Sequence, residues 1–97
     1  MPMTVVVTRN VSSRVRGFLA SVMLELAPGV YSAPRLSPAV RERVWQVLEQ
    51  WFPNEREASL ILLWQEPGIP GGQAVRVLGI SPVRFHEVDG LFLAHRP

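Results

Sequence analysis

The sequence lacks two residue types entirely, cysteine and lysine. The absence of cysteine excludes a disulfide scaffold, thiolate metal sites and a thiol nucleophile. The absence of lysine means that all ten cationic side chains are arginines. No apolar run approaches the ~18 residues of a membrane-spanning helix. No signal peptide is evident either, because Met1 leads directly into a strand-like run. We therefore expect a soluble cytoplasmic protein.

The chain is short but rich in apolar residues. Its 97 residues suit one domain, 1–97, and 47% of them are hydrophobic. A chain of this size buries only ~60–65% of its unfolded surface, so apolar side chains remain exposed on the folded monomer. We therefore expect an oligomer in which a second copy covers this surface.

Hydrophobic periodicity and turn residues predict alternating strands and helices. A first helix is expected after Ser12-Ser13, with an apolar stripe that continues through Leu26. A second helix is expected from Ser37-Pro38, where serine can cap the helix and proline can begin it. Its predicted apolar stripe consists of Val40, Val44, Val47, Leu48 and Trp51. The predicted strands lie at 3–8, 30–32, 58–64, 73–80 and 91–93.

Two amphipathic helices are too few to cover both faces of such a sheet. The element order therefore favours an α+β fold, a ferredoxin-like two-layer sandwich with both helices on one face. We expect a homodimer that forms through the free sheet face and the C-terminal strand. The segment 82–97 is expected at the dimer or partner interface.

The positive surplus of the chain lies near its N-terminus. The net charge is +2, yet residues 1–24 contain Arg9, Arg14 and Arg16 and no acid, which gives +3. The remaining residues, 25–97, are close to neutral. The net charge alone does not indicate nucleic-acid binding. The inference therefore depends on where these three arginines lie.

Two of these arginines, Arg14 and Arg16, fall in the first turn of the first predicted helix. A helix N-terminus carries about half a positive charge and normally attracts acids. Its N–H groups and two guanidinium groups would attract an anion such as phosphate. The alternative is that both are solvated arginines without a ligand. Gly17 costs the helix ~1 kcal/mol, which indicates close backbone approach by a ligand or tight packing against the sheet.

Residues of catalytic type are few and poorly placed. His86 and His95 have no acidic partner at metal-ligand spacing and are interpreted as surface residues. Glu42 and Glu49 lie among arginines on the second predicted helix and indicate a solvated helix face. The tryptophans are expected in the core or a dimer interface. We predict no catalytic residue and no metal site. The tryptophans are Trp45, Trp51 and Trp64, and the arginines of this helix face are Arg41 and Arg43.

The N-terminal third carries a specific pattern. MTVVVTRNV at 3–11 is followed by Arg14-x-Arg16-Gly17, and then by Leu24-Glu25 and the run PGVY at 28–31. In this pattern the sequence resembles the CRISPR-associated protein two family, in its type I-E branch. The likeness covers nearly the whole chain and includes Val40-Arg41-Glu42, Trp45, Trp64, Gly79 and the run VDGL at 88–91.

The resemblance implies a CRISPR adaptation (spacer acquisition) subunit. Such a subunit is a ferredoxin-like homodimer that bridges dimers of the CRISPR integrase and grips the backbone of a double-stranded protospacer DNA. Asn10, Arg14 and Arg16 match family positions that touch DNA, and Arg84 lies in a loop that is basic in relatives. DNA binding of this kind requires no cofactor. The family plan also has a hairpin between the helices, where the sequence shows only one strand.

One departure from the family concerns catalysis. Many members carry an acid at the end of the first strand, and a pair of these acids can hold Mg²⁺ for phosphodiester hydrolysis. Arg9 stands at this position, and a guanidinium cannot ligate a metal. We therefore expect duplex binding without cleavage. The alternatives are a Mg²⁺-dependent endonuclease acting on RNA or double-stranded DNA, and a regulatory or protein-interaction domain that binds no nucleic acid.

Overall fold

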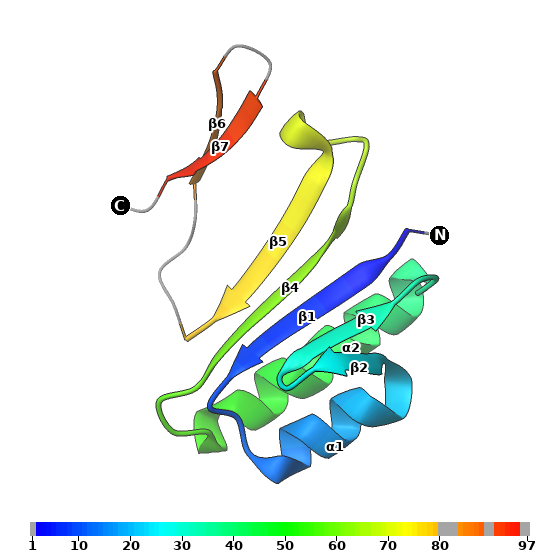
Figure 1. Cartoon of the computed structure of the whole chain (residues 1–97), viewed down its shortest axis with the longest axis vertical. Helices are drawn as coiled ribbons and strands as arrows, with labels where there is room; N and C mark the ends of the chain where they lie inside the picture. Colours follow the sequence, from blue (N-terminus) through cyan, green and yellow to red (C-terminus); the bar gives the residue numbers. More distant parts are fainter. Residues whose placement is uncertain (1, 80–83, 89–90, 96–97) are drawn as a thin grey trace.

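A five-stranded sheet and two α-helices make up most of the chain (Figure 1). This computed structural model describes residues 2–79, 84–88 and 91–95, the last two ranges by their backbone alone. The main elements are β1 (Thr4–Arg9), α1 (Ser13–Val22), β2 (Leu24–Ala27), β3 (Val30–Ala33), α2 (Pro38–Trp51), β4 (Ser59–Gln65) and β5 (Gln73–Leu78). Two short 3₁₀ turns, η1 (Phe52–Asn54) and η2 (Pro70–Gly72), follow α2 and precede β5.

The strand order confirms the predicted ferredoxin-like sandwich. The sheet runs β2-β3-β1-β4-β5, and each neighbouring pair is antiparallel. The first four strands and the two helices follow the order β-α-β-β-α-β of that fold, and β5 extends the sheet beside β4. Two further strands, β6 (Arg84–Val88) and β7 (Leu91–His95), pair with each other as a two-stranded antiparallel sheet.

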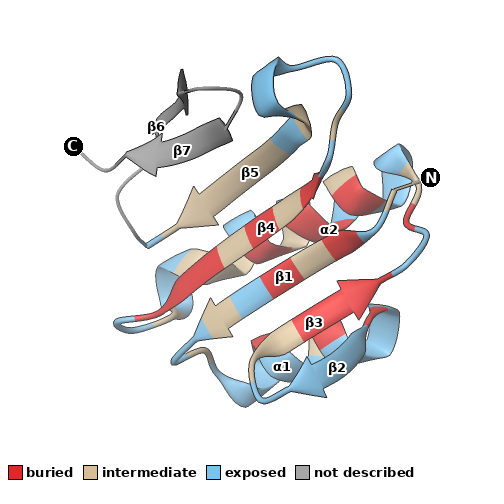
Figure 2. Ribbon diagram, turned by 45° about the horizontal axis from the view of Figure 1, so that its top comes forward, coloured by how far each residue is buried: buried red, intermediate tan, exposed pale blue. Residues whose placement is uncertain are grey.

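The core lies between the sheet and the helices, which both cover one face (Figure 2). Val6 on the central strand aligns with Tyr31 on one side and Leu62 on the other, and all three are fully buried. Val15 and Leu19 of α1, together with Leu48 of α2, pack against these residues from the helix layer. Alternation along each strand therefore directs one set of side chains into a single core.

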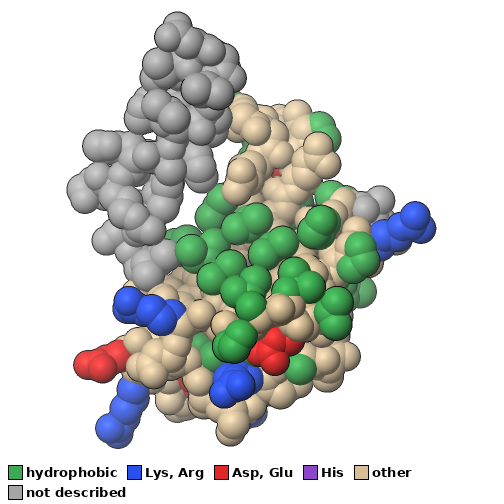
Figure 3. All heavy atoms as spheres, in the orientation of Figure 1, with side chains coloured by type: hydrophobic (Ala, Val, Ile, Leu, Met, Phe, Trp, Pro, Cys, Tyr) green, Lys and Arg blue, Asp and Glu red, His purple; other side chains and the backbone are tan. Residues whose placement is uncertain are grey.

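The other face of the sheet is apolar and open. Alternation and register place Val5 and Val7 of β1 on it, with Leu63 of β4 beside Val5 and Val75 of β5 beside Leu63. Val7 is 36% exposed, and both helices lie on the opposite face of the sheet (Figure 2). Hydrophobic side chains accordingly gather over the sheet in the space-filling view (Figure 3). None of the described helices combines the length and apolarity needed to cross a bilayer.

The region between the helices differs from the prediction. α1 ends at Val22 rather than continuing through Leu26, and the N–H of Met23 closes it by donating to Leu19 O at 2.8 Å. The following residues form β2, which pairs with β3 as a hairpin around a turn that contains Gly29. Pairing with β3 supplies hydrogen bonds along the strand, while Leu26 remains 61% exposed. The predicted helix end was wrong, and the hairpin of the family plan is present.

The buried face of α2 is also rotated from the predicted stripe. Val40 is 44% exposed, whereas Arg41 and Trp45 are 7% and 6% exposed. Arg41 stacks its guanidinium over the ring of Trp64 at 4.0 Å, which allows a charged side chain to lie inside. The predicted solvated face is therefore wrong for Arg41, whereas Arg43 and Glu49 are exposed as predicted. The predicted core role of the tryptophans is confirmed for Trp45 and Trp64.

Candidate nucleic-acid interface

Asn10 forms the turn between β1 and α1. Its φ is +58°, a left-handed conformation that asparagine tolerates better than most residues. Its amide nitrogen donates to the carbonyl oxygens of Arg56 and Glu57, at 3.3 and 3.4 Å. The amide nitrogen is thus engaged with the segment before β4, and the remaining side-chain oxygen can only accept hydrogen bonds. Its predicted contact with DNA stays a prediction.

A carboxylate from a distant segment holds the N-terminus of α1. Ser12 caps the helix, and its hydroxyl accepts a hydrogen bond from the N–H of Val15 at 3.4 Å. Glu55 accepts from the Ser12 N–H at 2.6 Å and from the Ser12 hydroxyl at 2.8 Å. The first turn of α1 contains no acid, so Glu55 supplies the negative charge that a helix N-terminus favours. Phosphate binding here would therefore depend on side chains more than on the helix end.

Arg14 lies over an aromatic ring at the surface. Its guanidinium carbon is 3.8 Å from the ring centroid of Trp51, the last residue of α2. Trp51 in turn makes an edge-to-face contact with Phe18, with ring centroids 5.4 Å apart. The side chain of Arg14 is exposed, and it makes no ion pair with a described acidic residue. The Arg14 charge is thus held at the surface without being neutralised.

Arg16 occupies a different environment, above the β2–β3 hairpin. It lies close to the hydroxyl of Tyr31, a fully buried residue whose hydroxyl oxygen has no hydrogen-bond partner of good geometry. Burial raises the pKa of Tyr31 above 10.0, the nearby Glu25 carboxylate raises it further, and the Arg16 guanidinium opposes the increase. Arg16 also borders a surface pocket of about 340 Å³, together with Asn10 and Gly29.

The structure does not bring the predicted arginines into one cluster. Residues two apart on a helix diverge by about 200°, so Arg14 turns toward α2 and Arg16 toward the hairpin. Together they flank the exposed start of α1. Gly17 is exposed, and a Cβ built on it would meet no atom within 4 Å beyond its chain neighbours and the backbone of its own helix. The suggested packing of Gly17 against the sheet is therefore wrong.

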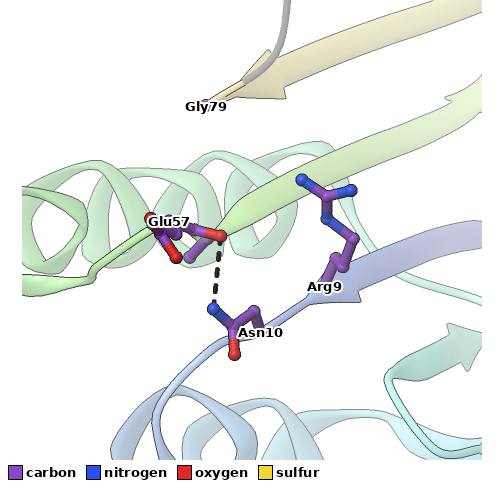
Figure 4. Close-up of a pocket in the computed structure, with 5 residues that line it drawn as sticks. Arg9, Asn10, Glu57 and Gly79 are labelled. Carbon is purple, nitrogen blue, oxygen red and sulfur yellow. Dashed lines mark hydrogen bonds between the residues drawn. The ribbon is translucent and has the colours of Figure 1, made fainter.

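Arg9 borders a separate surface pocket of about 550 Å³ at the end of the sheet, on the open-face side (Figure 4). Asn10, Glu57, Ala58 and Gly79 also line it. Gly79 has φ +78°, and a Cβ there would lie 2.2 Å from the Ala58 carbonyl oxygen, so only glycine fits. This pocket is where a family metal site would be expected.

The donor set of this pocket does not fit Mg²⁺. Among its described lining residues, Glu57 has the one carboxylate, while Arg9 contributes a positive charge. Mg²⁺ requires oxygen ligands, and a nearby guanidinium opposes binding of a cation. No group of three or more potential ligands of the His, Cys, Asp and Glu types occurs in the described part of the chain. We therefore derive no hydrolytic step through a metal here.

Two contacts at the start of α1 were not predicted from the sequence. Trp51 contacts Arg14, and Glu55 holds Ser12, across separations of 37 and 43 positions. A serine followed three positions later by glutamate would have indicated a local capping box, but Val15 stands there instead. The side chains of Arg84, His86 and His95 lie outside the described part of the structure, and the predicted interface segment 82–97 is described only by the backbone of β6 and β7.

Comparison with known protein families identifies a match over nearly the whole chain. Residues 3–93 match the family model described as CRISPR-associated protein (Cas_Cas2CT1978). The match extends from the start of β1 into β7 and covers nearly the whole chain. The chain therefore belongs to this family of CRISPR-associated proteins.

Proposed function

We propose that the chain is a type I-E CRISPR adaptation subunit that binds the backbone of a protospacer duplex without cleaving it. The observation that carries the proposal is the start of α1, where Arg14 and Arg16 are exposed and neither forms an ion pair with a described acid, since Glu55 is bonded to Ser12. Arginine binds phosphate through planar pairs of N–H donors, a contact that positions a protein on DNA without reading sequence. The membership of the chain in a CRISPR-associated family supports this choice over other anionic ligands.

The proposal includes a homodimer. The open face of the sheet presents apolar side chains on its central strand, among them Val5 and Val7, and exposed apolar faces of this kind commonly mark protein interfaces. A two-fold dimer through this face would present the start of α1 twice, once on each subunit. Two such sites on one assembly suit a long, regular ligand such as duplex DNA. The dimer would scaffold the CRISPR integrase around that duplex.

The experiment is a salt series of duplex-DNA binding by the wild type and by the double variant Arg14→Ala/Arg16→Ala. Removal of each phosphate contact should flatten the dependence of log K on log salt by about 0.9. The double variant should therefore bind less tightly at low salt and show a shallower slope, equally on unrelated sequences. The matched control is Arg35→Ala/Arg43→Ala, which removes two other exposed arginines from the chain.

The control should bind with a slope close to that of the wild type. An unchanged slope in the Arg14/Arg16 variant would remove these residues from the interface. No retention of duplex at low salt by the wild type would instead favour a regulatory or protein-interaction domain. A second series with a candidate integrase tests whether the partner is needed for measurable binding.

A further inference from the structure

Arg14 and Phe18 lie one turn apart on α1, and both contact the same indole ring. The guanidinium carbon of Arg14 is 3.8 Å from the centroid of the Trp51 ring. Phe18 meets that ring edge to face, with an interplanar angle of 66°. Trp51 is half-buried and packs against the hydrophobic core, so its ring has a fixed orientation. The Arg14 side chain therefore rests on a platform that the fold has already immobilised.

This stack leaves the binding capacity of Arg14 intact. A guanidinium stacks through its flat face, while its N–H donors point outward in the plane of the group. No described acid forms an ion pair with Arg14. An arginine on a flexible stem must lose rotamer freedom when it binds, and one already held in place loses less. The platform should thus raise affinity without adding a contact to the ligand.

We infer that Trp51 is a positioning residue that holds the Arg14 guanidinium ready for a phosphate of the duplex. This inference rests on the proposed function, because it assigns Trp51 a role in the same binding site. Trp51 itself makes no contact with the DNA in this arrangement.

Arg16 provides the internal comparison. It belongs to the same helix turn and is also exposed, but it stacks on no described aromatic ring. It lies instead near the hydroxyl of Tyr31. A change at Trp51 should therefore affect what Arg14 does and leave the contribution of Arg16 unaltered.

The test is a double-variant cycle on duplex binding with Trp51→Leu, which keeps an apolar side chain but removes the ring. Alone, Trp51→Leu should weaken binding severalfold and leave the salt slope unchanged, since the phosphate contact can still form. Arg14→Ala should weaken binding and flatten the slope by about 0.9. The weakening caused by Trp51→Leu should vanish in the Arg14→Ala background and persist in the Arg16→Ala background.

A spectroscopic measurement tests the stack in the free protein. Ring current from Trp51 should shift the proton resonances of the Arg14 side chain upfield relative to those of Arg16, and Trp51→Leu should abolish this shift. Trp51→Phe retains an aromatic ring, so it should restore part of both the shift and the affinity. If Trp51→Leu impairs folding, the same cycle is run with Trp51→Phe, whose smaller effect should also depend on Arg14.

The outcomes separate the inference from the proposed function. If Arg14→Ala weakens binding and Trp51→Leu does not, the positioning role is refuted while duplex binding stands. If Trp51→Leu weakens binding equally with and without Arg14, its role is structural and the inference is again refuted. If neither Arg14→Ala nor Arg16→Ala changes binding, the proposed function itself fails.

Discussion

The arginines of this chain occupy distinct environments, and the environment determines what each can do. Arg41 and Arg76 lie against the ring of Trp64, with guanidinium carbons 4.0 and 5.4 Å from its centroid. Arg76 also forms an ion pair with Glu42 at 2.8 Å. These guanidinium groups are engaged within the fold. Arg14 instead presents a stacked but unneutralised charge to solvent, which makes it a candidate for an external anion.

Tyr31 leads to a prediction about pH. Burial raises the pKa of its hydroxyl above 10.0, and the Glu25 carboxylate raises this pKa further. The unfolded state therefore loses this proton at a lower pH than the folded state does, so stability declines as pH rises above about 10. Because the sequence has no lysine or cysteine and one tyrosine, no other side chain titrates between about pH 8 and 12. Urea unfolding at a series of pH values should show the decline.

Tyr31→Phe is the control for this prediction. It removes the ionisable hydroxyl and keeps the ring, so its stability should be nearly constant over the same pH range. Ultraviolet absorbance of the wild type should show the tyrosinate forming above pH 10 when the protein is folded. Titration at or below the ordinary tyrosine pKa would contradict the buried placement.

At the scale of elements, α1 is held in place by a residue outside it. Glu55 bonds both the N–H and the hydroxyl of the cap residue Ser12. The carboxylate connects the start of α1 to the segment after η1, next to the Asn10 side chain, which donates to the same segment. These contacts fix the position of the start of α1, from which the side chains of Arg14 and Arg16 project. The β1–α1 turn is therefore positioned by two long-range contacts.

The Ser12–Glu55 contact leads to a prediction about stability. Ser12→Ala and Glu55→Ala should each lower the free energy of unfolding by about 1 kcal/mol, through loss of a helix cap and of charge-assisted hydrogen bonds. The double variant should fall short of the sum by at least about 0.5 kcal/mol, because both changes break the same contact. Denaturant unfolding measures all the variants. Strict additivity would show that the two residues act independently.

Sequence patterns predicted most elements but not all of their ends. β-branched and apolar runs identified β1, β4 and β5, and Ser37-Pro38 marked the start of α2 correctly. Leu26 extended the helical periodicity of α1, yet pairing with β3 drew it into an edge strand. The strand β6 was also not predicted. The periodicity of a segment carries no information about hydrogen bonds to a neighbouring strand. For this reason β2 was not predicted.

The whole molecule is a two-layer sandwich with one covered and one open face. Figure 1 shows both helices on the same side of the sheet, and Figure 3 shows apolar side chains on the other. The order of elements was enough to predict this architecture, because two helices cannot cover two faces. Contacts such as Arg14 on Trp51 could not be predicted, since they depend on how α1 and α2 approach each other.

The open face leads to a prediction about assembly. Val7→Glu places a charge in the middle of the apolar face, so it should shift the protein toward monomer in sedimentation analysis. Val40→Glu is the matched control, because Val40 is a similarly exposed valine, at 44%, on the outer surface of α2. It should leave the oligomeric state unchanged. A shift toward monomer in both variants, or in neither, would contradict a dimer through the sheet face.

The central claim is that this chain binds a duplex without cutting it, and one measurement tests both parts together. End-labelled duplex DNA is incubated with the wild-type protein and Mg²⁺ at low salt, and a parallel sample receives a chelator. The bound fraction is recovered and its strands are measured under denaturing conditions. We predict that the duplex is retained and that its strands stay full-length in both samples. Strand cleavage that requires Mg²⁺, or no retention of the duplex, would contradict the claim.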